Sequence, residues 1–505
     1  MPVNTQHRAY KAHAVKWQRC RDVAEGQDAV QAAGEKYLPR LQDQPVPEYN
    51  KYKMRASFYN ASWRTIAGLL GMIFSKPVRI EVPDAVKELL EDVDGAGTPI
   101  ELFIQDNTEN AITVGRVGVL VDYPQAPDGV TLADAQAMNL RPTLQLYQAE
   151  SIVNWRVRVV NNRKVPVLVV LKESEEVIDP KDEYVLTAED RWRVLDLIDV
   201  PTDGMGEAGV RYRQRLYKIK GGKQNQNKVL EFEPVDSPIF PLMNNKPLDY
   251  IPFYANGTDD ATLDDVDDPP LIDLVDVNLG HYRITAIYEQ CLTFSPPTLF
   301  LTGYKKENPN DKVYVGSGTA IISSNENAKG SFIEYTGGGL SPLEKALAAK
   351  EQQMAILGAR MLEPMKKGVE TADTASIHRK GEESLLSSIA KAISLCMTAA
   401  LKTYVEWAGF DPTNVLVSVN DDFHVAGLTA VDISARISAW QQGAPGFSDQ
   451  SLFDQMQKGE VIAPELTLED EQARIAERQQ QLMDQQVAAQ AALSGGQQGG
   501  GGPLQ

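Results

Sequence analysis

The chain is poor in cysteine. Its 505 residues include only Cys20, Cys291 and Cys396, which are far apart in the sequence and form no Cys-x-x-Cys pair. Two of them fall in helical apolar stripes, where cysteine behaves as a small hydrophobic side chain. This spacing favours a reducing compartment and argues against a disulfide framework.

Long apolar runs are also missing. The longest, residues 66–74, falls far short of the roughly 20 residues that a membrane-spanning helix needs. The N-terminus carries Lys and Arg without the apolar segment of a secretory signal. We therefore expect a soluble protein with no membrane contact, and the length is enough for about three domains.

Basic residues are outnumbered, and the net charge is -19. This balance argues against a protein that grips nucleic acid through its phosphates. An acidic wall would instead repel a DNA backbone and keep it mobile. Simple solubility explains the charge of most of the surface equally well.

Sequence motifs for catalysis are absent. The chain has no GxxxxGK[ST] loop, no GxSxG elbow and no HExxH pair, and its five histidines form no two-ligand pattern. Residues 493–497 spell the signature peptide of ABC-type ATPases, but no phosphate-binding loop accompanies it, so we treat the match as coincidence. We predict no catalytic residue, no cofactor and no metal.

The sequence contains one cluster of carboxylates that could bind a metal ion. A short polar linker carries Asp259, Asp260, Asp264, Asp265, Asp267 and Asp268. Oxygen ligands at such short spacing can bind a hard cation, although the central Gly and closing Glu of an EF-hand are missing. A solvated loop that places acid before a helix N-terminus is the alternative interpretation.

Residues 271–407 organise the chain as helix, β-rich insertion, helix, loop and long helix. The first helix carries a stripe with three-four spacing: Leu274, Val277, His281, Ile284, Tyr288 and Cys291. The second begins at Ser341 with a Pro in its first turn, and its stripe is Leu343, Leu347, Lys350, Met354, Leu357 and Met361. The third covers 386–407, with Gly409 as its C-terminal stop.

The insertion between the first two helices is rich in β-forming residues. Its short runs are 298–301, 313–315, 320–322 and 331–335. Two helices of roughly 20 residues, each about 30 Å long, would hold this unit away from the body. An ordinary α+β domain with a hairpin excursion fits the same periodicity.

The remaining segments follow simple patterns. Residues 1–50 are expected to form helical segments ending at Pro45 and Pro47, and 55–74 a helix with Trp63 on its apolar face. A sheet-rich region covers 141–236, and the run 415–423 is expected to add a strand to it. Helices are predicted at 433–441, 449–458 and 468–490, before a Gly/Gln-rich tail that is disordered from Ser494.

The order of these elements resembles the core of tailed-bacteriophage portal proteins, in particular a branch known mainly from phage genomes. The stretches that carry the resemblance are RASFYN (55–60), GLLGMIF (68–74), GRVGVLVDYP (115–124), YQAESIVNWR (147–156), DVNLGHYR (276–283) and ETA (370–372). They extend over roughly residues 50–410, and their order and spacing are more specific than any one of them.

This resemblance implies an α+β, portal-like fold with named regions. They are an N-terminal helical segment (1–50), a sheet-rich wing (51–268), a stem helix (269–297), a β-rich clip (298–340), a second stem helix (341–363), a tunnel loop (364–373), a long helix with a returning wing strand (374–425), a helical crown (426–490) and the tail (491–505).

The resemblance also implies a function without catalysis. Portal proteins form a twelvefold ring at one capsid vertex of the virion, assembled in the host cytoplasm with major capsid protein and scaffold. Double-stranded DNA passes through the ring without sequence specificity during packaging by a terminase and during ejection. Head-completion or adaptor proteins dock on the ring afterwards.

Five residues are candidates for sites under this interpretation. Lys366, Lys367 and Glu370 correspond to the tunnel loop that faces DNA, and His281 and Lys350 lie in the stem stripes, where a channel or subunit interface would explain their polarity. Two alternatives stay open: a metal-dependent hydrolase or nuclease that uses the aspartate cluster at 259–268, and a scaffolding adaptor that oligomerises without a channel.

Overall fold

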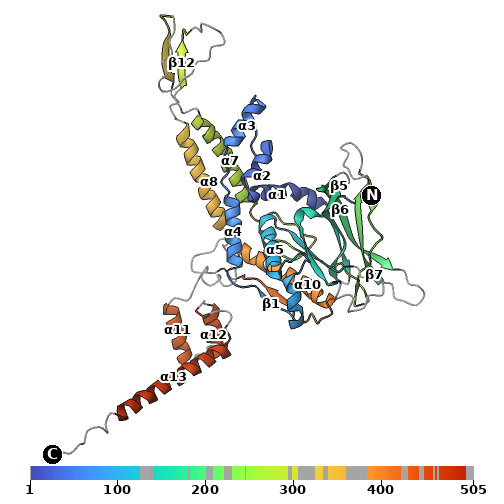
Figure 1. Cartoon of the computed structure of the whole chain (residues 1–505), viewed down its shortest axis with the longest axis vertical. Coiled ribbons are helices and arrows are strands. Elements are labelled where there is room, and N and C mark those ends of the chain that lie inside the picture. Colours follow the sequence, from blue (N-terminus) through green and yellow to red (C-terminus); the bar gives the residue numbers. More distant parts are fainter. Residues whose placement is uncertain are drawn as a thin grey trace, which may run out of the picture. The chain divides into compact units, whose positions relative to one another are not determined.

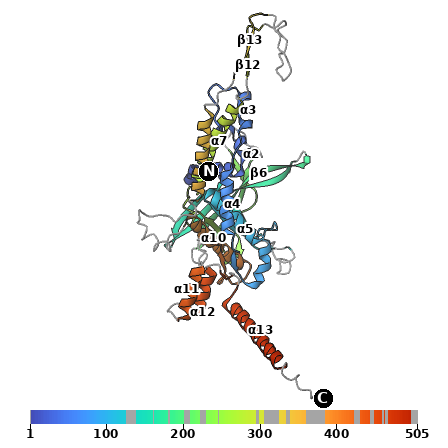
Figure 2. The ribbon, with the colours of Figure 1, turned by 90° about the vertical axis from the view of Figure 1, so that its left-hand side faces the viewer.

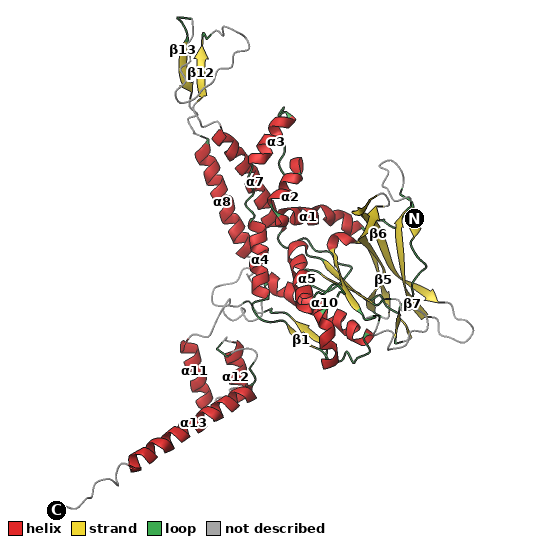
Figure 3. Ribbon diagram, in the orientation of Figure 1, coloured by secondary structure: helices red, strands yellow, loops and turns green. Residues whose placement is uncertain are grey.

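A computed structural model gives the fold as α+β, as predicted. Residues outside its description are 1, 125–137, 139, 161, 180–181, 201–208, 221–229, 245, 294–297, 305–324, 334–338, 360–383, 422, 424–429, 443–447, 459–460, 463–465 and 496–505. The chain divides into two compact units, Met1–Phe423 and His424–Gln505. Figure 3 distinguishes the helices and strands of both units.

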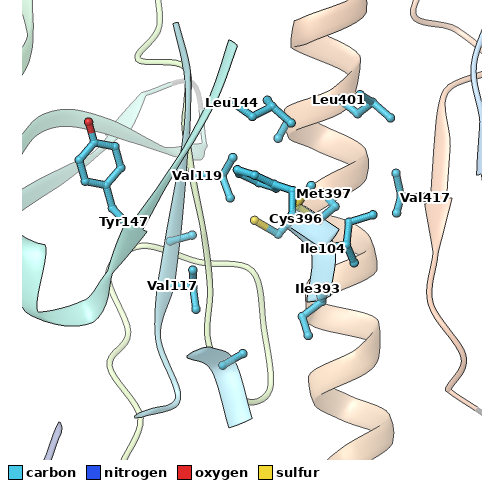
Figure 4. Close-up of a cluster of buried hydrophobic side chains, with 14 of the residues drawn as sticks. Ile104, Val117, Val119, Leu144, Tyr147, Ile393, Cys396, Met397, Leu401 and Val417 are labelled. Atoms are coloured by element: carbon cyan, nitrogen blue, oxygen red, sulfur yellow. The ribbon is translucent and has the colours of Figure 1, made fainter. Parts of the chain in front are cut away.

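The core of the first unit is built around α10 (Leu385–Trp407). One side of this helix packs on a three-stranded antiparallel sheet of order β11-β2-β3, and β14 lies on the other. Figure 4 shows Cys396 and Met397 facing Val119 of the sheet, with Val417 of β14 across the helix. The strands are β2 (Val117–Asp122), β3 (Thr143–Gln148), β11 (Phe253–Asn256) and β14 (Leu416–Ser418).

The sequence of α10 explains why it is central. The Ser384 hydroxyl accepts a hydrogen bond from Ser387 N at 3.2 Å and caps the start, and Gly409, at φ +88°, follows the end. Apolar residues occur all around the helix, which is typical of a buried one. By length and composition α10 would qualify as a membrane span, yet 56% of that window is buried within the protein.

A second, five-stranded antiparallel sheet follows the strand order β4-β5-β6-β7-β8. Its strands are β4 (Ile152–Val160), β5 (Arg163–Asp179), β6 (Asp182–Val200), β7 (Gly209–Ile219) and β8 (Phe232–Pro234). β6 is the longest of them, and its residues 182–190 pair with β5 in a ribbon that continues beyond the sheet.

Two predictions about the sheets are wrong. The run after α10 does not extend the earlier sheet: β14 pairs with β1 (Arg79–Glu81) in a separate two-stranded sheet. β3 belongs with β2 and β11 rather than with its sequence neighbours β4 and β5. In both cases a partner distant in the sequence supplies the edge, which local patterns do not reveal.

The N-terminal helices also differ in their boundaries. They are α1 (Arg8–Glu25), α2 (Gln27–Ala32), α3 (Val46–Arg55) and α4 (Ala61–Ile73). The helix predicted at 55–74 begins only at Ala61, because Asn60 caps it by accepting a hydrogen bond from Trp63 N at 2.9 Å. Trp63 itself is 40% exposed. Pro47 lies in the first turn of α3 rather than at a helix end, a position that suits its missing N–H.

The first unit also contains several short elements and one further helix. They are the 3₁₀ turns η1 (Gly34–Lys36), η2 (Asp84–Glu91) and η3 (Ala149–Ser151), helix α5 (Ile100–Val114), and the small strands β9 (Leu242–Met243) and β10 (Lys246–Pro247).

A helix pair interrupted by a hairpin follows, as the periodicity predicts. Helices α7 (Ile272–Thr293) and α8 (Leu340–Ala359) lie side by side in both views (Figures 1 and 2), and between them in the sequence are β12 (Thr298–Thr302) and β13 (Lys329–Ile333). β12 and β13 form an antiparallel pair. The strands expected at 313–315 and 320–322 lie outside the described residues.

The second unit is helical, with α11 (Ala430–Gln441), α12 (Asp449–Lys458) and α13 (Leu468–Gly495). Phe453 and Met456 of α12 are buried. A capping box starts α13, since Thr467 N and Asp470 N each donate to the other residue's side chain. α13 continues through Gly495, so disorder does not begin at Ser494, because the Ala-rich run before it favours helix.

Candidate functional site

Helix α7 is fastened to the body by buried polar side chains. Asn278, fully buried, accepts hydrogen bonds from Ser62 N and Oγ at 3.1 and 3.0 Å. Its Nδ2 donates to Tyr59 O at 2.8 Å. This one amide therefore supplies hydrogen-bond partners to backbone groups at the start of α4, and it fixes α7 against that segment.

Another face of α7 is covered by the N-terminal helices. Val275, Leu279 and Tyr282 belong to an apolar cluster whose other members come mainly from α1, α2 and α3. Arg283 Nε donates to Tyr37 O at 2.8 Å, and Arg19 pairs with Asp276 at 2.5 Å. The predicted three-four stripe of α7 captures only part of its buried surface, because the helix is covered on more than one side.

His281 lies on the α8 side of α7. Its side chain is only 7% exposed, and Nε2 is 3.5 Å from a carboxylate oxygen of Glu351 on α8. The ring's Nδ1 is 3.4 Å from Thr285 Oγ1. Burial lowers the pKa of His281, while the Glu351 carboxylate raises it and Lys350 lowers it further. The polar side chain of His281 thus has a partner, Glu351, within the same chain.

Close helix approach depends on a glycine. A Cβ on Gly280 would lie 3.0 Å from Lys350 Nζ and 3.2 Å from its Cε, so the lysine side chain fills the space that glycine leaves. Further along, Tyr288 donates to Glu344 at 3.1 Å. The structure therefore places Lys350 and His281 together between α7 and α8. Their role in a channel or subunit interface stays a prediction.

The outer side of α8 is bare in the single chain. Met354 is its only buried residue, and the predicted stripe from Leu343 to Leu357 lies on the half-covered side toward α7, while Met361 lies outside the described residues. Ile356 on the outer side is 48% exposed, and Ala348, Ala349 and Ala355 are exposed with it. This side consists mainly of small residues, is interrupted by the exposed Lys345 and Gln352, and is open to a partner.

The β12–β13 hairpin also exposes apolar side chains. Phe300, Phe332 and Ile333 are 49%, 64% and 54% exposed. An isolated two-stranded hairpin is marginally stable in water, and exposed aromatic residues are typical of binding surfaces. The three apolar side chains therefore favour a partner for this hairpin.

The candidate DNA-facing residues lie outside the described residues. Lys366, Lys367 and Glu370 fall within 360–383. They stay a prediction from the resemblance.

The aspartate cluster does not form a metal site among the described residues, where no group of three or more His, Cys, Asp or Glu could hold a metal ion. Its carboxylates have separate partners: Asp264 pairs with Lys164 at 2.6 Å, and Asp267 accepts from Thr258 Oγ1 at 2.5 Å. Asp268 pairs with Lys16. Three of the six carboxylates thus have partners within the chain, whereas burial and the nearby carboxylates of Asp267, Asp260 and Asp265 raise the pKa of Asp259.

Arg116, which our sequence analysis did not single out, orders this same loop. Its guanidinium is 2% exposed, donates to Asp265 O at 2.8 Å and to Leu263 O at 2.9 Å, and lies 4.3 Å from the Trp155 ring. Burial lowers the pKa of Arg116 to about 10, and the carboxylates of Asp267 and Asp265 oppose this shift. The loop between sheet and α7 is therefore held by a buried cation.

The GRVG segment around Arg116 owes its glycines to packing. Gly115 ends α5 at φ +75°, and a Cβ on Gly118 would lie 2.2 Å from Phe253 Cζ. The segment that contributes to the portal resemblance therefore has structural reasons for its residues, and the signal that could have found Arg116 is its place between these two glycines.

Neither Cys20 nor Cys396 is activated as a nucleophile. Burial raises the pKa of both Cys20 and Cys396 to about 12, and the thiolate is the reactive form. Cys396 is also part of the apolar core around α10. Cys396 behaves as a small core hydrophobe, as its stripe indicates, whereas Cys291 in the stripe of α7 is only half-buried.

The fold is thus α+β, with a helix pair that projects a hairpin and has one bare side. The family described as a domain of unknown function, DUF4055, matches residues 270–408, from the start of α7 to the end of α10. No curated protein matches the chain.

Among solved structures, chains of gene transfer agent (GTA) particles align with it. One from the neck of the native particle, computed with C12 symmetry, has 13% identity and a TM-score of 0.35 over 85% of this chain and 98% of that one. One from the virion of the native particle has 11% identity and a TM-score of 0.33 over 84% and 96%. One from the neck of the empty particle, computed with C6 symmetry, has 13% identity and a TM-score of 0.34 over 85% and 98%. Likeness at this level says nothing of what this chain binds.

Proposed function

We propose that the chain is the subunit of a portal-type ring in a phage-like virion. The observation that carries the proposal is the bare side of α8: 20 residues of helix with a single buried side chain. A neighbouring copy that covers this side would bury Ile356 and the exposed alanines around it. Copies placed by one repeated rotation close into a ring.

The order of elements supports a channel rather than a plain oligomer. Two helices pack lengthwise, an apolar hairpin connects them, and the long helix α10 follows after residues 360–383. In the ring, α7 and α8 form the stem, the hairpin is the clip that docks terminase and then head-completion proteins, and the unit His424–Gln505 is the crown. Major capsid protein and scaffold surround the ring at one capsid vertex, after assembly in the host cytoplasm.

The chain's acidity is consistent with DNA that slides. With a net charge of -19, the ring would repel the phosphates of double-stranded DNA over most of its surface and bind no sequence tightly. The scaffolding adaptor is the second class of function that a bare α8 allows, and it differs in lacking a central hole.

Negative-stain electron microscopy with native mass measurement tests the ring. We expect rings with a central hole and about twelve copies. Ile356→Glu should reduce the ring fraction at least about tenfold, because a carboxylate would be buried in an apolar contact. Leu102→Glu is the matched control: Leu102 is 52% exposed on α5, and this change should leave the rings intact.

A monomer or dimer that persists at high concentration and with scaffold would contradict the proposal. Elongated oligomers without a hole would favour the adaptor instead.

The tunnel loop has its own test. Lys366→Glu combined with Lys367→Glu should leave ring formation unchanged and reduce the DNA packaged per particle severalfold, because added carboxylates repel the phosphate backbone in the channel. Packaged DNA is measured by nuclease protection in a packaging reaction. The conservative change of both lysines to arginine keeps the charge and should package as the unchanged chain does. Equal packaging by the Glu variant would remove these residues from the channel.

A further inference from the structure

The longest strands of the first unit continue beyond their sheet. β4 pairs with β5 no further than Leu171, and β7 pairs with β6 from Arg191 onward. Residues 174–179 and 182–190 therefore pair only with each other among the described residues, and we call this ribbon the arm. Six residues of strand extend about 20 Å. Figure 2 shows it beside the label β6, projecting from the unit.

One face of the arm is apolar and uncovered. Ile178 lies directly opposite Leu186, so these two side chains share a face, and Tyr184 lies just beyond them in the part of β6 where the pairing register shifts. They are 57%, 57% and 88% exposed. A free two-stranded ribbon with three large apolar side chains in water is an expected site of association.

The arm is also strongly acidic. Residues 174–190 contain seven carboxylates and one lysine; the acids are Glu175, Glu176, Asp179, Asp182, Glu183, Glu189 and Asp190. Arg191 pairs with Glu175 and Lys172 with Asp190 at the base. Glu176 and Glu183 are exposed and have no ion pair with any described residue. A partner of the arm must therefore be apolar in part and basic at its rim.

The opposite end of β5 is basic. Residues 155–171 contain no carboxylate and four basic residues, Arg156, Arg158, Arg163 and Lys164. Lys164 pairs with Asp264, whereas the three arginines are exposed and have no carboxylate partner among the described residues. Val159, beside them on β4, is 65% exposed. We call this region, at the turn between β4 and β5, the basic end.

The arm and the basic end cannot meet within one chain. β5 has 17 residues, which as an extended strand span about 55 Å, and the two regions lie at its two ends. β4 is the edge strand of its sheet, so backbone groups beside the basic end are open to another strand. A second copy of the same chain offers the complementary charge, the apolar side chain and the free edge together.

We propose that neighbouring copies join head to tail, with the arm of one copy against the basic end of the next. Such a contact is heterologous, because two different surfaces meet, and repetition of it closes a ring when the rotation fits. The proposal rests on the ring described above and adds the contact that sets its direction. The acid–arginine pairs orient the copies, and Ile178, Tyr184 and Leu186 bury apolar area.

Charge reversal tests the contact in the full-length chain. The first variant carries Glu176→Lys and Glu183→Lys in the arm, and the second carries Arg158→Glu and Arg163→Glu in the basic end. Alone, each brings like charges together and should weaken assembly at least about tenfold. Mixed in equal amounts, each arm meets an oppositely charged basic end of the other variant, so rings should return with the two variants alternating.

Native mass measurement and negative-stain images read out the fraction in rings and the composition of each ring. A single chain with all four changes should also assemble, because its contact is restored with reversed sign. Glu88→Lys with Glu101→Lys is the matched control, since both residues are exposed acids outside the arm and the same charge change there should leave assembly intact.

The outcomes separate this contact from the ring itself. If the unchanged chain forms rings and both variants do so equally well, the head-to-tail contact is wrong and the ring stands. If each variant fails and neither mixing nor the four-change chain restores rings, the charge pairing is wrong. If the unchanged chain never forms rings, the proposed function and this contact both fall.

Discussion

Helices α10 and α8 are of similar length, 23 and 20 residues, and have opposite surroundings. Fifteen residues of α10 are buried, including polar Ser387, Ser388 and Thr403, whereas α8 buries Met354 alone. Both are rich in Ala and Leu, so composition does not separate them. The difference teaches that the single chain completes the packing of one helix and leaves most of the other exposed.

The largest expected effect is on stability, and it sharpens this comparison. Leu401→Ala in α10 should lower the free energy of unfolding by about 2–5 kcal/mol, because a fully buried side chain leaves a cavity. Ile356→Ala in α8 should change it by no more than about 0.5 kcal/mol in the monomer, because its side chain is half exposed. Urea unfolding of the monomer measures both.

On ring assembly, we expect Ile356→Ala to have the larger direct effect of the two substitutions. In the ring, Ile356→Ala should raise the concentration needed for assembly, whereas Leu401→Ala should affect it only through folding. A large loss of monomer stability from Ile356→Ala would mean that α8 is already packed within one chain, and the contrast would be broken.

The helical part of the fold is largely predictable from sequence. The three-four stripes place α7 and α8, and the predicted ranges 386–407 and 468–490 match α10 and most of α13, because helix signals are local. The sheet assignments of β3 and β14 fail because their partners, β11 and β1, come from distant parts of the chain. Asn60 shows the remaining kind of error, since one capping side chain moves a helix start by several residues.

The two acidic regions show why sites are harder to predict. In sequence, the cluster at 259–268 and the arm both appear as carboxylate runs. In the first, Lys16 pairs with Asp268 and Lys164 with Asp264, from about 250 and 100 residues away in the sequence, and the buried Arg116 interacts electrostatically with Asp267 and Asp265. The arm's exposed acids Glu176 and Glu183 have no such described partner. Only the tertiary structure separates a loop whose carboxylates have cationic partners within the chain from an arm whose exposed Glu176 and Glu183 have none among the described residues.

The smallest predicted effect concerns pH, at the contact between α7 and α8. Burial lowers the pKa of His281 in the folded protein below its usual value of 6.5. As the pH falls through 6.5, the unfolded chain therefore takes up this proton before the folded chain does, and the folded state loses stability. The loss should be less than about 1 kcal/mol, because Glu351 is 58% exposed and solvent screens the pair.

Removing the partner charge should enlarge this acid sensitivity. Glu351→Gln takes away the carboxylate that favours the imidazolium, so the pKa of His281 falls further and more stability is lost between pH 8 and pH 5. Glu344→Gln is the matched control on the same helix, because Glu344 contacts Tyr288 instead. Urea unfolding at the two pH values gives the difference. If Glu351→Gln and Glu344→Gln respond alike, His281 is not the titrating group, and the α7–α8 contact is held by apolar packing at Met354 and by the fit of Lys350 against Gly280.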